Sequence, residues 1–242
     1  MPGKARRYSY SDQKKQKHRV RWVVFIVLIL FLLYSALTSF AFSMKVLEND
    51  TMSPNLLAGD RFIFSNYNIY SFIPGLDSER RNLPLRRGNI VLVDMFQGER
   101  PGTLLRVFDG LVRFFTFQRA SIIGQNEFLF IKRIIGLPGD EIVMNNFLVR
   151  VRVKGSEFSL TEFEVTEADY TPIIPHHSAL WDSSLPFSGD MDKIVLGENE
   201  VFLLSDDRSN TNDSRTWGPV PLTNIQGRAL FRYWPLNRLG RP

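Results

Sequence analysis

The chain of 242 residues is long enough for one folded domain with attached segments, and its 44% hydrophobic and 23% charged residues are typical of a globular protein. It contains no cysteine, which excludes disulfides, thiol nucleophiles and thiolate zinc sites. Only three histidines occur. Because His18 lies in a charged tail and His176 and His177 lie in a Pro- and Ser-flanked loop, a Ser-His-Asp triad is not expected.

The basic charge is confined to the N-terminus. Residues 1–21 hold eight Lys and Arg residues and one acid, a net charge of +7, so the chain's total of +5 leaves −2 for the remainder. Such a tail can bind nucleic acid, but the segment that follows it offers a better explanation. We therefore predict no nucleic-acid partner and interpret residues 1–21 as a cytoplasmic tail.

An uninterrupted apolar segment follows the tail. Residues 22–42 contain no charged residue, glycine or proline. As a helix they extend about 31 Å at about 1.5 Å per residue, which matches the hydrocarbon core of a bilayer. Because the tail is basic, we expect a single-pass anchor in the cytoplasmic (inner) membrane, with the N-terminus inside and residues 45–242 on the outer or periplasmic side. The alternative is a cleaved secretory signal, since residues 41–43 resemble a small-x-small cleavage site.

Residues 45–242 carry short apolar runs bounded by Gly, Pro, Asn and Asp, a pattern typical of β-strands. The predicted fold class is therefore mainly β, with coiled or barrel-like antiparallel sheets behind an N-terminal transmembrane helix. The predicted strands are Arg61–Ser65, Ile90–Met95, Glu127–Ile135, Glu141–Arg152, Lys193–Leu196, Glu200–Leu204 and Gly227–Tyr233.

One segment of this domain has a different pattern. In Gly102–Ile123, apolar residues recur at helical spacing, and arginines interrupt them at positions 106, 113 and 119. The pattern predicts an insertion that is either a helix packed on the sheet or an amphipathic segment lying on the membrane surface.

Three polar or basic segments lie between the predicted strands. Residues 49–56 read NDTMSPNL and follow the apolar segment closely. Residues 130–140 read FIKRIIGLPGD, with a lysine inside an apolar strand that runs into a Pro-Gly-Asp turn. Residues 205–221 read SDDRSNTNDSRTWGPVP and form a dense polar loop.

In order, spacing and local sequence, these segments resemble the boxes of bacterial type I signal peptidases, the Ser/Lys-dyad leader peptidase family. The first box, S-M-x-P-T-L, stands here as TMSPNL, and the lysine box, IKR-x-x-G-x-PGD, is complete. The last box, GDNR-x-N-S-x-DSR-x-WG-x-VP, stands as SDDRSNTNDSRTWGPVP, and residues 86–91 resemble the remaining box with Asn89 in place of Asp. The main departures are Thr51 and Thr211 for two serines, and residues 205–207 (SDD) for Gly-Asp-Asn.

The chemistry of peptide hydrolysis explains why such residues occur together. The reaction needs a nucleophile, a base and an oxyanion site. A lysine acts as the base only when it is neutral, so burial has to lower its pKa from about 10.4. A hydroxyl–lysine pair is a known variant of the Ser-His-Asp arrangement. The apolar neighbours of Lys132 that supply such burial are Phe130, Ile131, Ile134 and Ile135.

The resemblance implies a role for each matching residue. Thr51 takes the position of the nucleophile, and Lys132 takes that of the general base. Thr211 takes the position of a hydroxyl that orients the lysine amine, and Asn49 that of a residue that binds the oxyanion with the backbone N–H of the nucleophile. The implied supporting charge cluster is Arg133, Asp213 and Arg215. The implied substrate-binding residues are Met52 and Pro54, which line the substrate groove, and Phe130 and Ile131, within the strand Glu127–Ile131 that pairs with the extended substrate.

The function implied by the resemblance is that of a membrane-bound endopeptidase that removes signal peptides from exported preproteins. The partners are signal peptides with small residues at positions −3 and −1, together with the lipid bilayer, and no cofactor is implied. Because threonine adds a methyl group to the nucleophile, a catalytically weakened paralogue that only binds signal peptides is the alternative. A structural envelope domain is a third hypothesis. No metal is predicted, because the aspartates of residues 205–215 lack the terminal Glu and the turn Gly of a calcium loop.

Overall fold

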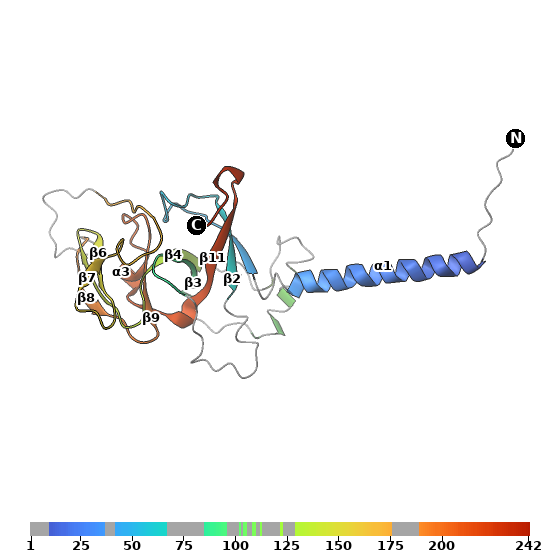
Figure 1. Cartoon of the computed structure of the whole chain (residues 1–242), viewed down its shortest axis with the longest axis horizontal. Helices are drawn as coiled ribbons and strands as arrows, with labels where there is room; N and C mark the ends of the chain where they lie inside the picture. The colour runs from blue at the N-terminus through green and yellow to red at the C-terminus, as the bar shows by residue number, and fades with distance from the viewer. Residues whose placement is uncertain are drawn as a thin grey trace. The chain divides into compact units, whose positions relative to one another are not determined.

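A computed structural model describes residues 10–36, 42–66, 85–95, 129–175 and 189–242, together with positions 102, 104, 105, 108, 109, 112 and 122. The chain divides into two compact units, one made of residues 1–39 and 101–124 and the other of residues 40–100 and 125–242. The second unit contains all of the strands that the structure describes (Figure 1).

The first unit contains the helix α1 (Tyr10–Ala36), which begins inside the basic tail and includes most of the predicted span of residues 22–42. The span prediction was wrong at its far end, because Phe42 already belongs to the strand β1. Within the described part of the chain, no helix combines the length and the apolar character needed to cross a membrane.

The predicted insertion Gly102–Ile123 also belongs to the first unit, and most of it lies outside the described residues. Leu104, Leu105 and Phe108 are helical and exposed. Asp109 is buried and accepts a hydrogen bond of 2.6 Å from the backbone N–H of Ile122. The choice between a packed helix and a membrane-surface segment therefore stays open.

The second unit is built on a seven-stranded antiparallel sheet with the order β1-β2-β11-β3-β4-β9-β10. Residues 90–94 are all buried, because their strand lies between two neighbours and packs on both faces, which explains their continuous apolar sequence. The strands are β1 (Phe42–Val46), β2 (Arg61–Asn66), β3 (Ile90–Asp94), β4 (Leu129–Gly136), β9 (Glu200–Leu204), β10 (Val220–Pro221) and β11 (Ile225–Trp234).

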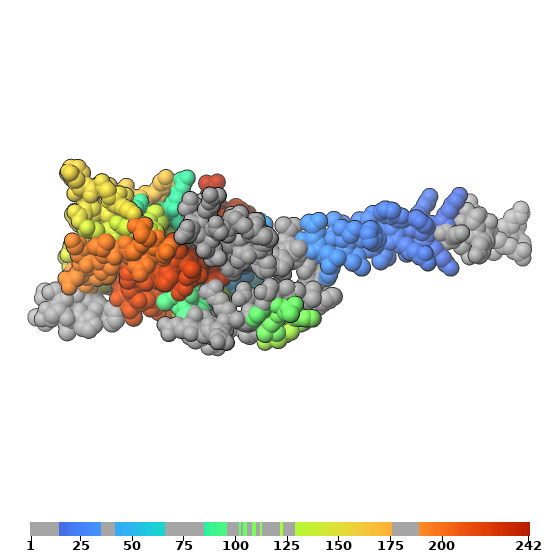
Figure 2. Space-filling model, turned by 90° about the horizontal axis from the view of Figure 1, so that it is seen from below, coloured from blue at the N-terminus to red at the C-terminus, as the bar shows by residue number. Residues whose placement is uncertain are grey.

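A second antiparallel sheet has the order β7-β6-β5-β8. Its strands are β5 (Glu141–Asn145), β6 (Leu148–Arg152), β7 (Ser159–Thr161) and β8 (Met191–Val195). Burial alternates along β5 and β6, so one face of the sheet packs into the core while the other faces solvent. In the space-filling view the yellow and orange residues lie side by side, in agreement with the pairing of β5 with β8 (Figure 2).

The predicted continuous strand Glu141–Arg152 was wrong, because this segment is a hairpin. Asn145 pairs with Leu148, and the two residues between them, Asn146 and Phe147, have φ values of 49° and 61°. Type I′ hairpin turns need positive φ at both central positions, and asparagine tolerates that conformation better than most residues. The apolar pattern continues across the turn, which conceals it in the sequence.

The other predicted strands are confirmed within about two residues at the boundaries that the structure describes. The mainly β antiparallel fold class is also confirmed. The strand β1 and the shorter strands β7 and β10 were not predicted. Short helical segments occur at α3 (Ser214–Trp217), η4 (Leu222–Asn224) and η5 (Leu236–Arg238).

The close pairing of β2 with β11 makes one glycine critical for the large sheet. A Cβ added at Gly227 would lie 2.0 Å from the backbone oxygen of Ser65. We expect Gly227→Ala to lower the free energy of unfolding by roughly 2–3 kcal/mol, because β2 has to move to relieve the overlap. Urea denaturation of the full chain in detergent measures the change.

The matched control is Gly197→Ala, where the nearest atom to the added Cβ is Glu200 Oε2 at 3.1 Å, the movable end of a side chain. This variant is expected to change stability by less than about 1 kcal/mol. If both variants lost the same free energy of unfolding, the close backbone contact at Gly227 would not be what makes this glycine necessary for stability.

Candidate active site

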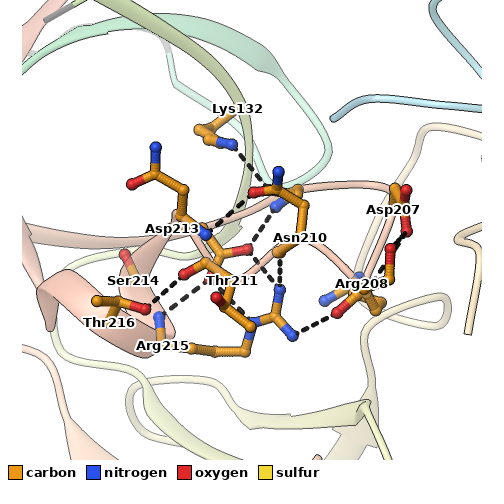
Figure 3. Close-up of polar contacts among 12 residues, drawn as sticks. Lys132, Asp207, Arg208, Asn210, Thr211, Asp213, Ser214, Arg215 and Thr216 are labelled. Atoms are coloured by element: carbon orange, nitrogen blue, oxygen red, sulfur yellow. Dashed lines mark hydrogen bonds and ion pairs between the residues drawn. The ribbon is translucent and has the colours of Figure 1, made fainter. Parts of the chain in front are cut away.

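The candidate base, Lys132, lies on β4 between two neighbouring strands. It pairs with Val91 on β3, and the next residue, Arg133, pairs with Leu204 on β9. The side chain of Lys132 is 1% exposed, and its Nζ donates a hydrogen bond of 2.8 Å to Ser205 Oγ. Figure 3 shows the amine directed toward the loop that carries Asn210, Thr211 and Asp213.

Burial changes the protonation of this lysine. The pKa of Lys132 is lowered to about 8, mainly because the buried ammonium loses its hydration. The carboxylate of Asp213 acts in the opposite direction, and Arg215 lowers the pKa further. The Nζ atom of Lys132 also lies over the face of the Trp217 ring, 5.8 Å from its centroid. A lysine with this pKa is partly neutral in mildly alkaline solution, so it can accept a proton there.

The candidate nucleophile, Thr51, lies in the turn after β1 and is half-buried. Its Oγ1 donates a hydrogen bond of 2.8 Å to Asn49 Oδ1, and its backbone N–H points at the same oxygen at 3.4 Å. Its carbonyl oxygen accepts a hydrogen bond of 3.1 Å from the backbone N–H of Asp207. This backbone contact ties the turn of Thr51 to the polar loop of residues 205–217.

A second contact between the turn of Thr51 and the polar loop of residues 205–217 was not predicted from the sequence. Asn55 Nδ2 donates to Asp206 Oδ2 at 2.9 Å and to the carbonyl oxygen of Thr171 at 3.0 Å. The sequence feature that could have indicated this contact is Asn55 itself, which stands where the family's first box has threonine. The longer amide side chain reaches two acceptors at once, and so fixes the far end of the turn.

The predicted charge cluster consists of two separate ion pairs. Arg133 holds Asp206 with two hydrogen bonds of 2.7 and 2.6 Å, and Arg215 holds Asp213 with bonds of 2.9 and 2.8 Å. Burial would raise the pKa of Asp213, but its hydrogen bonds with Arg215 and with the backbone N–H of Ser205 outweigh burial and hold it below the usual range.

Asp213 also shapes the loop. Its Oδ1 accepts from the backbone N–H of Arg215 at 3.1 Å, so it caps the short helix α3. Its Oδ2 accepts from the backbone N–H of Ser205 at 3.0 Å. The same carboxylate therefore holds both ends of the loop, next to the Lys132 amine (Figure 3).

The structure differs from the expectation for Thr211. Among the described residues, the hydroxyl that contacts the Lys132 amine is that of Ser205, and no hydrogen bond joins the amine to Thr211. The carbonyl oxygen of Thr211 instead accepts from Asp213 N at 2.8 Å and Thr216 Oγ1 at 2.5 Å. The physical reason is that Ser205 directly follows β9, the strand paired with β4, which places it beside Lys132.

The four predicted substrate-binding residues differ in exposure. Met52 and Ile131 are buried in one hydrophobic core cluster. Phe130 is half-buried and packs on Trp217, with 5.2 Å between the ring centroids, while Pro54 is exposed. Met52 thus anchors the turn of Thr51 to the core, and its predicted contact with substrate stays a prediction.

A buried lysine with a lowered pKa and a hydroxyl in contact with its amine are features that a hydrolase of the hydroxyl–lysine class requires. Residues 19–234 match the signal peptidase, peptidase S26 family, and the chain belongs to that family. The family predicted from the sequence boxes is thereby confirmed.

Similar proteins cover nearly the whole chain. The chain is 26% identical over 219 residues to a probable signal peptidase I-1 of Synechocystis sp., covering 90% of this chain and 83% of the relative. It is 26% identical over 231 residues to a signal peptidase I of Bacillus caldolyticus, covering 93% and 96%. It is 29% identical over 202 residues to a signal peptidase I of Leptolyngbya laminosa, covering 84% and 73%.

The protonation of Lys132 can be measured without a substrate. We expect its amine to titrate with a midpoint near pH 8, because burial disfavours the ammonium. NMR of the full chain with lysine labelled at 13Cε follows the titration, and loss of one signal in Lys132→Met assigns it. A midpoint near the ordinary lysine pKa of about 10.4 would contradict the buried-base geometry.

Proposed function

We propose that this protein is a membrane-bound endopeptidase that removes signal peptides from exported preproteins, with Thr51 as the nucleophile and Lys132 as the general base. The observation that carries the proposal is the buried Lys132 amine with its pKa lowered to about 8. Membership of the signal peptidase family and the similarity to signal peptidases I over most of their length support the substrate class.

In the proposed first step, Thr51 Oγ1 turns from Asn49 toward the amine and gives its proton to Lys132 Nζ. The oxygen attacks the scissile carbonyl carbon, and the resulting oxyanion binds to the backbone N–H of Thr51 and the amide nitrogen of Asn49. That nitrogen makes no hydrogen bond within the described residues, so it is available to donate. Lys132 then protonates the leaving amine, which leaves an ester on Thr51.

In the second step, Lys132 takes a proton from water, and the water oxygen attacks the ester carbonyl. The ester bond breaks, Thr51 regains its proton from Lys132, and the product leaves as a carboxylic acid, which gives its proton to solvent water. The lysine thus ends each cycle neutral, as it began, so the mechanism needs no cofactor.

One part of β4 supports the binding of an extended peptide. Residues 129–132 pair with β3 on one side, while pairing with β9 begins only at Arg133. Within the described residues, the other side of this short stretch is not used by a strand of the sheet. A peptide that pairs there by β-augmentation would place its backbone beside Lys132.

Membrane attachment by α1 is part of the proposal. The apolar side chains of residues 22–30 are each at least 43% exposed. Exposing such a surface to water is unfavourable, and a lipid environment removes the cost. The basic residues of the tail precede this surface, in the order expected for an N-in orientation.

The test of function is cleavage of a synthetic preprotein by the purified full chain in detergent. Thr51→Ala and Lys132→Met are each expected to lower turnover at least ~100-fold, because they remove the nucleophile or the base. The control is Ser53→Ala, which removes the neighbouring hydroxyl of the same turn and is expected to change turnover little. Activity that survives in Thr51→Ala would place the nucleophile elsewhere.

The orientation in the membrane has its own test. Protease added to the outer face of intact cells that display the protein is expected to degrade residues 45–242 and spare residues 1–21, because the basic tail stays inside. Permeabilised cells serve as the control, since both parts then become accessible. Protection of the C-terminal part in intact cells would refute the N-in orientation.

A further inference from the structure

Ser205 is a fully buried hydroxyl that the proposed mechanism does not use. Its side chain is 0% exposed, and its Oγ lies 2.8 Å from Lys132 Nζ. The family's last box has glycine at this position, so the resemblance assigns no role to the side chain. A buried polar group normally has a hydrogen-bond partner, and here the partner is the candidate base.

The backbone of Ser205 is fixed on both sides. It directly follows Leu204, which pairs with Arg133, the neighbour of Lys132. Its N–H donates to Asp213 Oδ2 at 3.0 Å, and Asp213 is itself held by Arg215. A hydroxyl on such a rigid backbone can hold a long, flexible lysine side chain in one orientation.

The geometry of a neutral amine makes this contact useful. Such an amine has two N–H groups and one lone pair, and only the lone pair can accept the proton of a nucleophile. If one N–H donates to Ser205 Oγ, rotation about the last bond of the lysine is restricted, and the lone pair is directed to the remaining positions. Without that acceptor, the amine samples orientations in which the lone pair faces away from a nucleophile.

Burial also separates the roles of the two hydroxyls. Ser205 is inaccessible, so a peptide carbonyl cannot reach its oxygen, whereas Thr51 is half-buried in an exposed turn. Thr211 makes no hydrogen bond to the amine in the described residues. The hydroxyl that contacts the amine thus stands at a different position of the loop than the one the resemblance implies.

We propose that Ser205 is a positioning residue that holds the Lys132 amine in the orientation needed for proton transfer, in place of Thr211. This inference rests on the proposed function for its effect on turnover, but the contact itself does not depend on it. No bond is made or broken at Ser205, and its hydroxyl keeps its proton throughout.

The test compares Ser205→Ala with Thr211→Ala in the full chain in detergent, by two measurements. The first is the pH dependence of kcat/KM on a synthetic preprotein, and the second is the NMR titration of Lys132. In Ser205→Ala the ammonium loses an acceptor, so both midpoints are expected to fall below the wild-type value of about 8. The value of kcat/KM that Ser205→Ala reaches at high pH is expected to be roughly 10- to 100-fold below that of the wild type, with most of the loss in kcat. In Thr211→Ala the Lys132 midpoint is expected to stay at the wild-type value.

A matched control separates positioning from stability. Ser214 is also buried, and its Oγ accepts a hydrogen bond of 3.0 Å from the backbone N–H of Leu203, away from the lysine. Ser214→Ala therefore removes a comparable buried hydroxyl of the same loop. Its melting temperature is expected to fall like that of Ser205→Ala, while its Lys132 midpoint stays at the wild-type value.

The outcomes decide between the possible roles. The inference would be overturned if Ser205→Ala kept the wild-type Lys132 midpoint and the wild-type kcat/KM at high pH. It would also be overturned if Thr211→Ala shifted the Lys132 midpoint more than Ser205→Ala does. An inactive Ser205→Ala beside an active Thr51→Ala would make Ser205 the nucleophile and also overturn it. If even the wild-type protein cleaves nothing, the proposed function fails, and the Lys132 titration alone decides whether Ser205 holds the amine.

Discussion

The burial of one amine is the constraint on which the rest of the site depends. A lysine that is 1% exposed loses nearly all of its hydration, and the protein has to replace those contacts or leave the amine neutral. Here both happen, since Ser205 supplies one hydrogen bond and the pKa falls to about 8. The same desolvation that makes the ammonium unstable is what makes the neutral amine available as a base.

The surrounding charges are arranged so that they do not cancel this effect. Asp206 and Asp213 would both favour the ammonium, but each is paired with an arginine that takes up most of its hydrogen-bonding capacity. Breaking either buried pair would leave an uncompensated charge and cost roughly 3–5 kcal/mol. The ion pairs therefore maintain both the loop geometry and the low pKa of Lys132.

The elements of the site could be predicted from the sequence, but several of its contacts could not. The strands β4 and β9, and the polar loop after β9, follow from local apolar runs and turn residues, and the burial of Lys132 follows from the isoleucines beside it. Ser205 could not be recognised in this way, because its contact depends on the register of two strands about 70 residues apart. The hairpin within Glu141–Arg152 was missed because its turn lacks glycine.

The same long-range pairing explains how the site holds together. The turn of Thr51 is bound to the loop of residues 205–217 by one backbone contact and by Asn55, while Met52 fixes it to the core from the other side. The loop is in turn fixed to β4 by Arg133 and Asp206. The loop, the turn and the lysine are therefore all held by the same pair of strands, β4 and β9. Small relative shifts between a nucleophile and a base are costly to catalysis, so this shared support is what the proposed mechanism requires of Thr51 and Lys132.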